Sequence, residues 1–184
     1  TGEVTSSNYT TVKYNSSGNI SWVRIFDSGN DDKAEGVATD SAGNVIVTGT
    51  SEGGSSNFYT IKYDASGNAL WNKTYDGGNS DLANEVATDS SDNIYVTGRT
   101  YDGSSYNYLT IKYDASGNAL WNKTYDDGAS DTSYGVTTDG SDNVYVTGRS
   151  YDGSSTNIYT IKYDSSGNVL WNRTYDSGND DWGF

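Results

Sequence analysis

The sequence predicts an all-β protein assembled from four-stranded units that repeat along the chain. Three observations predict this class. A period of roughly 50 residues runs through the chain, which is typical of repeat architectures. Each period holds short β-branched and aromatic runs separated by turn residues. No segment shows the 3.6-residue period of a helix, and scattered glycines would destabilise one.

The repeat is visible by direct comparison. Residues 57–106 and 107–156 align without a gap and are identical at 37 of 50 positions. The string TIKYD occurs three times, with a diverged copy near the start, and Trp recurs in register at Trp22, Trp71, Trp121 and Trp171. We predict a single repeat region over 1–184, divided into a partial unit 1–33, units 34–82, 83–132 and 133–182, and residues 183–184 starting the next.

Four strands are predicted in order within the unit that begins at residue 83. The first, Glu85–Thr88, is short and made of small or branched residues, and the second, Asn93–Thr97, reads NIYVT. The third, Asn107–Tyr113, places Tyr and Ile for alternate faces, and the fourth, Ala119–Tyr125, reads ALWNKTY. β-branched and aromatic residues favour a pleated, half-buried surface, which is why these runs indicate strands.

Short turns separate the strands. Asp89–Asn93 and Asp114–Asn118 have the form D-x-x-[G/D]-N, and Asp-Gly at Asp102 marks another hairpin. Asp at the start of such a turn accepts from backbone N–H groups, and Gly or Asp near its end suits a left-handed backbone position.

Four antiparallel strands in about 40–50 residues, repeated in tandem, are the sequence signature of β-propeller blades. One blade has two apolar faces and needs a neighbour on each. The strand of small residues fits the crowded axis, and the Trp strand fits the wider outer position. A β-solenoid is the alternative, but its coils are usually shorter and need no tight hairpins.

A resemblance follows from these motifs. Asp89–Thr100, then Tyr113–Trp121, together with Asp40–Thr50 and Tyr63–Trp71, resemble the beta-propeller repeat family called SBBP. The resemblance covers essentially the entire chain, with small departures such as Ile46 where other copies have Tyr. It implies a propeller fold in a bacterial or archaeal protein that is secreted or attached to the cell surface. The family brings no catalytic motif.

The chain carries about 3.7 repeats, whereas propellers typically need 4–8 blades to close. We therefore expect an arc of a larger propeller, or a ring completed by another chain, and the missing initiator Met favours a processed product or part of a longer protein. The expected partners are other copies of the chain or the remainder of a longer propeller. Unpaired strands at Thr1–Ser6 and Asp181–Phe184 would offer edges for such association.

Composition excludes several function classes. The formal net charge is −14, which repels phosphate backbones and anionic lipids, so no nucleic-acid partner is expected. No stretch approaches the apolar length of a membrane span, so no membrane insertion is expected. Without His or Cys there is no Ser-His-Asp triad, no cysteine nucleophile and no thiolate zinc site.

Aspartate loops link each Trp strand to the next unit, as in 76–81 and 126–131. Calcium prefers several oxygen ligands from a turning loop, so Asp76, Asp81, Asp126 and Asp131 are candidate ligands. The EF-hand order with its closing Glu is absent, and Gly-Asp loops are common without metal. No other cofactor is expected.

Ligand-binding candidates lie where the units differ most, at the start of the first strand, which would lead to one mouth of a central channel. The sequence of exposed loop positions also varies without any functional reason, which is the alternative explanation of these differences. Trp71, Trp121 and Trp171 recur at one position, as packing residues of a repeat do, whereas Trp182 has no counterpart. The candidates are Lys33, Glu35, Asn84, Glu85, Tyr134 and Trp182.

Sequons on the fourth strand make Asn72, Asn122 and Asn172 glycosylation candidates, although Asn and Thr are abundant. Catalysis needs an asymmetric set of groups, and the near symmetry of the repeats argues against an enzyme, although Asp is plentiful enough to leave paired carboxylates for glycoside hydrolysis open. The sequence thus favours a non-catalytic structural or interaction module, extracellular or at the cell surface. The alternative is a carbohydrate-binding or lyase-like propeller with its site at the channel mouth.

Overall fold

A computed structural model describes residues 6–182, and this range holds only strands, turns and loops, with no helix. The strands are β1 (Tyr9–Tyr14), β2 (Ile20–Phe26), β3 (Asp32–Thr39), β4 (Val45–Glu52), β5 (Ser56–Tyr63), β6 (Ala69–Tyr75), β7 (Asp81–Thr88), β8 (Ile94–Tyr101), β9 (Tyr106–Tyr113), β10 (Ala119–Tyr125), β11 (Asp131–Thr138), β12 (Val144–Tyr151), β13 (Thr156–Tyr163) and β14 (Val169–Tyr175). The all-β prediction is confirmed.

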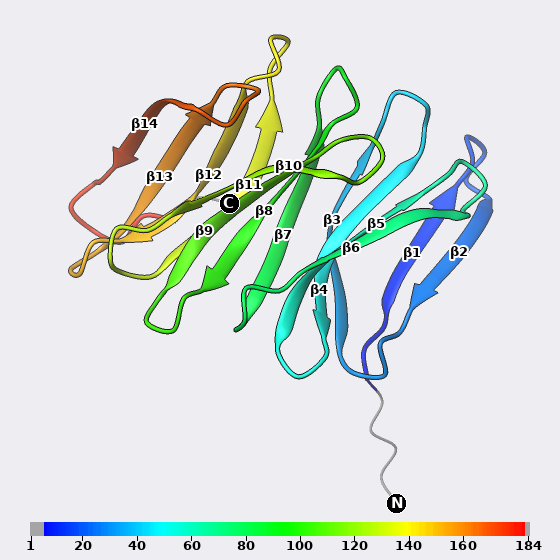
Figure 1. Ribbon diagram of the computed structural model, residues 1–184, viewed down its shortest axis with the longest axis horizontal. Helices are drawn as coiled ribbons and strands as arrows, with labels where there is room; N and C mark the ends of the chain where they lie inside the picture. Colours follow the sequence, from blue (N-terminus) through cyan, green and yellow to red (C-terminus); the bar gives the residue numbers. More distant parts are fainter. Residues whose placement is uncertain (1–5, 183–184) are drawn as a thin grey trace, which may run out of the picture.

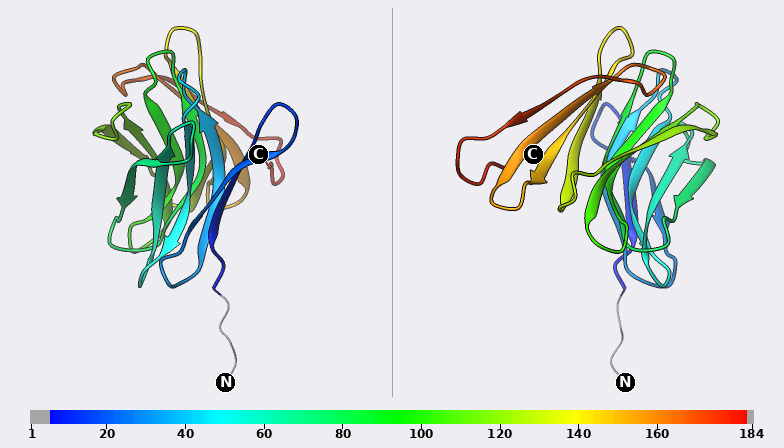
Figure 2. Two further views of the ribbon diagram at one scale, coloured as in Figure 1. Left: turned by 90° about the vertical axis from the view of Figure 1, so that its right-hand side faces the viewer. Right: turned by 60° about the vertical axis from the view of Figure 1, so that its left-hand side comes forward.

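The strands form four antiparallel sheets in chain order. Sheet 1 is β1–β2, sheet 2 is β3–β6, sheet 3 is β7–β10 and sheet 4 is β11–β14, and in each sheet sequential strands are neighbours. The sheets stack face on face in an open arc, with sheet 1 and sheet 4 at opposite ends (Figure 1). Two further views show the same stacking from other sides (Figure 2). We call the face of each sheet toward the preceding sheet its leading face and the opposite face its trailing face.

The first strand of each full sheet lies innermost. β7 contacts both β3 and β11, so the inner strands of successive sheets lie side by side, while β6, β10 and β14 are edge strands. Inner strands pack closely because they carry Ala, Gly and Val, for example Ala83 and Val86 in β7. The predicted placement of small residues inside and Trp strands outside is confirmed.

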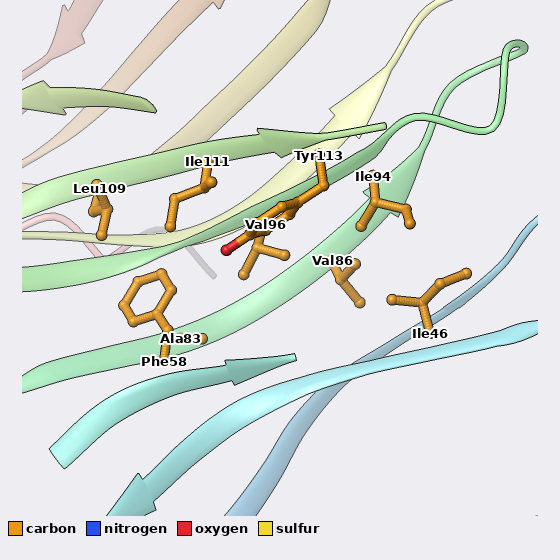
Figure 3. Packing of buried hydrophobic residues seen from close by; sticks show 9 residues of the cluster. All are labelled: Ile46, Phe58, Ala83, Val86, Ile94, Val96, Leu109, Ile111 and Tyr113. Carbon is orange, nitrogen blue, oxygen red and sulfur yellow. The ribbon is translucent and has the colours of Figure 1, made fainter. Parts of the chain in front are cut away.

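Apolar clusters fill the gaps between consecutive sheets. Figure 3 shows the one between sheets 2 and 3, where Ile46 and Phe58 of the trailing face of sheet 2 meet Val86, Leu109 and Ile111 of sheet 3. Equivalent clusters join sheet 1 to sheet 2 and sheet 3 to sheet 4. Within residues 6–182 each buried cluster draws its side chains from two consecutive sheets, so each unit depends on its neighbours for burial.

The recurring tryptophans belong to these interfaces. The rings of Trp71 and Tyr113 have centroids 6.1 Å apart, and the Trp71 indole N–H donates to the Ala115 carbonyl at 3.1 Å. Trp22 and Trp121 make the equivalent contacts with Tyr63 and Tyr163 of the following sheet. The packing role predicted for the repeated Trp is confirmed for Trp71 and Trp121.

The D-x-x-[G/D]-N turns form as predicted. Asp89 Oδ1 accepts from the backbone N–H groups of Ser91 and Asn93, both at 2.9 Å, and Asn93 Nδ2 donates to Oδ2 at 2.8 Å. Asp92 has a φ of 60°, a left-handed conformation that Asp tolerates better than most side chains. The same caps occur at Asp40, Asp64, Asp114, Asp139 and Asp164.

Most strand boundaries agree with the prediction within one residue, and two differ by four residues. β7 starts at Asp81 rather than Glu85, and β8 continues past Thr97 to Tyr101. The reason is a register shift between Ala83 and Glu85, which breaks the alternation that sequence patterning relies on. Of the edges predicted for association, residues 1–5 and 183–184 lie outside the described residues.

Candidate functional site

A β-bulge interrupts every inner strand at the position where the units differ most. In β7, Ala83 pairs with Gly98 and Glu85 pairs with Thr97, which leaves Asn84 as the extra residue. The same shift leaves Glu35 extra in β3 and Tyr134 extra in β11. Bulges re-aim side chains and are frequent beside binding sites. Three of the six predicted ligand-binding residues are therefore bulge residues.

The Thr-Gly dipeptide of the second strand makes the bulge possible. A Cβ on Gly98 would overlap the carbonyl oxygen of Leu82, well inside the 3.0 Å that real Cβ contacts respect, and Gly49 and Gly148 face the same obstacle. The preceding Thr97 hydroxyl lies 3.2 Å from the Thr110 hydroxyl of the third strand, with both residues buried. The recurrence of Thr-Gly and of TIKYD thus has a structural cause.

The structure distributes the predicted ligand-binding residues along the arc, on the inner strands β3, β7 and β11 and in the segment after β14. Lys33 and Glu35 are exposed on β3, and Glu35 lines a groove between β1 and β3. Asn84 and Glu85 are half-buried on β7, and the Asn84 amide donates to the Ser133 carbonyl of β11 at 2.7 Å. Asn84 thus ties two inner strands together.

Tyr134 and Trp182 are brought together at the end of the arc that sheet 4 forms. The guanidinium carbon of Arg149 lies 5.6 Å from the ring centroid of Tyr134 and 5.3 Å from that of Trp182, distances typical of cation–π contact. Trp182 is 56% exposed. Sequence reasoning missed Arg149, although Arg follows Thr-Gly in two units and the counterpart Arg99 lies 4.3 Å from the ring of Tyr106.

The aspartate loops use their carboxylates to hold their own turns. Asp76 Oδ1 accepts from the Gly78 N–H at 2.8 Å, and Asp126 Oδ1 accepts from the Gly128 N–H at 2.7 Å. Asp81 Oδ2 accepts from the Gly77 N–H at 2.6 Å. Among residues 6–182, no group of three or more acidic side chains is close enough to hold a metal ion. These loops therefore offer fewer free oxygens than calcium usually takes.

Asp131 differs from its counterparts. It is fully buried, and neither of its carboxylate oxygens accepts a hydrogen bond. In the first unit the equivalent Asp32 accepts from Ser28, but residue 127 is Asp, and the Ser150 hydroxyl donates to Asp127 at 2.7 Å instead. Burial, with the charge of Asp127 as a smaller contribution, raises the pKa of Asp131 to about 7.

The turn carboxylates are shifted in the opposite direction. Hydrogen bonds from Asn118 and the turn amides hold the pKa of Asp114 below its usual value, and those from Asn68 do the same for the pKa of Asp64. A carboxyl group with a lowered pKa is a poor proton donor at neutral pH. The repeated Asp residues are therefore suited to turn stabilisation rather than acid catalysis.

The glycosylation candidates lie on the edge strands. Asn72, Asn122 and Asn172 are exposed on β6, β10 and β14. Asn72 and Asn122 line the outer gaps between consecutive sheets. No helix within residues 6–182 has the length and apolar character to span a membrane.

Comparison with known proteins supports the fold. Residues 126–154 match the family model described as beta-propeller repeat, SBBP, which confirms the resemblance seen in the sequence. The solved structures include a protein of unknown function from Bacteroides caccae that is similar over 87% of this chain and 73% of its own, at a TM-score of 0.50 and 11% identity. At that identity the likeness concerns the fold alone. No curated protein matches the chain.

Proposed function

We propose that this chain is a non-catalytic structural or interaction module built of β-propeller repeats, and that it works outside the cell or on its surface. The observation that carries the proposal is that aspartate carboxylates of the repeats are used to hold backbone turns. Asp64, Asp89 and Asp114 each accept three hydrogen bonds that hold a turn. A carboxyl group held in its ionised form by such hydrogen bonds is a poor proton donor, so these turn aspartates are better suited to a structural role than to acid catalysis.

Composition supports the proposed location. The chain has no Cys or Met, the two side chains most readily oxidised, and its formal net charge of −14 favours a dispersed, hydrated surface. The partners we propose are units of the same kind, on other copies or in a longer chain. These properties suit a protein that persists in an oxidising medium.

Surface accessibility tests the proposal. Intact producing cells are treated with protease or a membrane-impermeant amine reagent, and the chain is followed by immunoblot alongside a cytoplasmic marker. The proposal expects loss or labelling of the chain while the marker stays intact, or recovery of the chain from the medium. Protection of the chain until the cells are lysed would contradict it.

The bulges favour a second function, carbohydrate binding at the rim of the inner strands. Glu35, Asn84 and Tyr134 occupy the same bulged position but differ in chemistry, as tuned recognition residues do. A glycan array tests it, with Tyr134→Ala and Glu85→Ala as variants. Binding that both substitutions abolish supports this function, and an array without signal leaves the structural module as the better account.

A further inference from the structure

The two ends of the arc expose faces that are covered everywhere else in the chain. On the leading face of sheet 1, Tyr14 is 59% exposed, whereas its counterparts Tyr63, Tyr113 and Tyr163 are 3%, 5% and 3% exposed. Val12 beside it is 39% exposed, whereas Ile61, Ile111 and Ile161 are at most 5% exposed. The difference arises because a preceding sheet covers the leading faces of sheets 2, 3 and 4.

The trailing face of sheet 4 is likewise less buried than the trailing faces of the internal sheets. β8 and β9 are buried on both faces through most of their length, whereas β12 and β13 alternate between buried and half-buried residues. Lys162 and its partner Asp139 have side chains 17% and 31% exposed, against 4% and 3% for Lys62 and Asp40. Tyr175 is 61% exposed, whereas its counterpart Tyr125 stacks on Tyr159 of the next sheet at 4.1 Å.

The internal interfaces show what fits these faces. In each of them a Trp of the trailing face packs against a Tyr of the following leading face, and its indole N–H donates to a carbonyl in the turn after that Tyr. Trp171 is the trailing-face residue that has no such partner among residues 6–182. Tyr14 and the turn 15–19 are the leading-face elements that no Trp covers. Gly18 in that turn has nothing within 4 Å of a Cβ position, whereas Gly67 and Gly117 pack on Trp22 and Trp71.

The segment after β14 is also arranged as if another sheet followed. The Ser177 N–H and hydroxyl both donate to Asp181 at 2.8 Å, as Ser28 does to Asp32 at the start of β3. The Asp181 N–H donates to the Thr156 carbonyl at 2.7 Å, as the Asp32 N–H does to Ser7. Asp181 therefore has the contacts of a residue that begins an inner strand.

We propose that the trailing face of sheet 4 binds the leading face of sheet 1 of a second copy, so that copies associate head to tail. In this contact the ring of Trp171 packs on the second copy's Tyr14, and the Trp171 indole N–H donates to the second copy's Ser16 carbonyl. The proposal extends the proposed function by naming the partner, but it does not depend on where the protein works. The interface is heterologous, because the two surfaces that meet are different.

The test is the native mass of the 184-residue chain by sedimentation velocity, over about a hundredfold range of concentration. The proposal expects species at integer multiples of 19.8 kDa that grow with concentration. Association should strengthen with added salt, since copies with a net charge of −14 repel one another at low ionic strength. A chain that stays at 19.8 kDa at the highest concentration and in high salt overturns the proposal, while the proposed function would stand with a different partner.

Two variants at opposite ends establish which surfaces meet. Tyr14→Asp disables the leading face and Tyr175→Asp the trailing face, and both side chains are more than half exposed, so folding should survive. Each variant alone should associate at least about 30-fold more weakly, because each places a charged side chain in the contact that the other copy covers. Mixed together, each supplies the face that the other lacks, so a one-to-one complex that cannot grow further should form.

Leu170→Ser is the matched control. Leu170 is 51% exposed, and its counterparts Leu70 and Leu120 stay 52% and 54% exposed although their sheets are internal. This side chain therefore lies outside the proposed contact, and its substitution should leave the association constant unchanged. Equal weakening by Leu170→Ser and Tyr175→Asp, or a mixture of the end variants that remains monomeric, would overturn the head-to-tail arrangement.

Discussion

Replacing Gly98 by Ala tests whether the inner-strand bulge holds the fold together. The new Cβ would overlap the Leu82 carbonyl oxygen, and reaching a separation of 3.0 Å requires β7 and β8 to part by about 1 Å. Backbone atoms are the obstacle, so no side-chain rotation relieves the overlap. Ladder hydrogen bonds of ordinary length, about 2.9 Å, would stretch beyond the range of a hydrogen bond at that displacement.

The magnitude follows from those bonds. Two ladder bonds beside the bulge would be lost, and because their groups stay buried without partners, each loss costs about 1–3 kcal/mol. Allowing for partial relaxation, we expect Gly98→Ala to lower the free energy of unfolding by about 3–5 kcal/mol. Urea denaturation followed by circular dichroism and Trp fluorescence measures it, with the slope of the transition checked for constancy.

Gly140→Ala is the control for this prediction. Gly140 lies in the turn after β11, has nothing within 4 Å of a Cβ position, and is replaced by Ser41 and Ser90 in the other units. Its substitution should change the free energy of unfolding by less than about 1 kcal/mol. If Gly98→Ala were as stable as Gly140→Ala, the bulge would tolerate a side chain and the explanation of the Thr-Gly motif would be wrong.

Two further predictions concern buried charge. With a pKa of 3.8 when unfolded and about 7 when folded, Asp131 makes stability fall as pH rises through that window. Asp127→Ser should reduce this fall and stabilise the protein at pH 8, because the neighbouring charge is replaced by a hydroxyl donor. Thermal unfolding across pH 4 to 8 measures it, and an unchanged pH profile would contradict the account of this pair. Lys62→Met leaves Asp40 buried without its ion-pair partner, whose Nζ lies 2.8 Å from Oδ2, and should lower stability by about 2–4 kcal/mol. Lys162→Met, at a more exposed pair, should lower stability by less than about 1 kcal/mol in the same urea assay, and equal losses would refute the argument from burial.

The fold was predictable because each unit repeats the same local signals. Ala119–Tyr125 was predicted to the residue, and the turn from Asp89 formed with the predicted cap, since both depend on contacts within a few residues. The start of β7 was not predictable in the same way. Its bulge depends on the close approach of the Leu82 carbonyl to Gly98 on the neighbouring strand. The alternation of residues along a single strand does not reveal such a contact.

The candidate site was predicted less completely than the fold. The variable positions were found by comparing units, and the structure shows that Glu35, Asn84 and Tyr134 share a bulge. Which of their side chains contact a neighbouring unit could not be foreseen, because it depends on how the sheets stack, as with the Asn84 amide and the Ser133 carbonyl. Arg149 was not identified because an Arg next to Thr-Gly is not in itself a binding signal. Its role depends on the rings of Tyr134 and Trp182, which only the fold brings next to it.

One consequence of the stacking concerns the length of such a protein. Within residues 6–182 the extensive contacts of each sheet are with its neighbours in chain order, and each such contact includes a Trp and its turn carbonyl. A whole unit can therefore be added or removed without creating a new kind of surface, because the sheets on either side of the change find the neighbour they already accept. The number of units is thus a quantity that can vary in single steps, independently of the sequence within each unit, and the reach of the protein would grow by one sheet at a time.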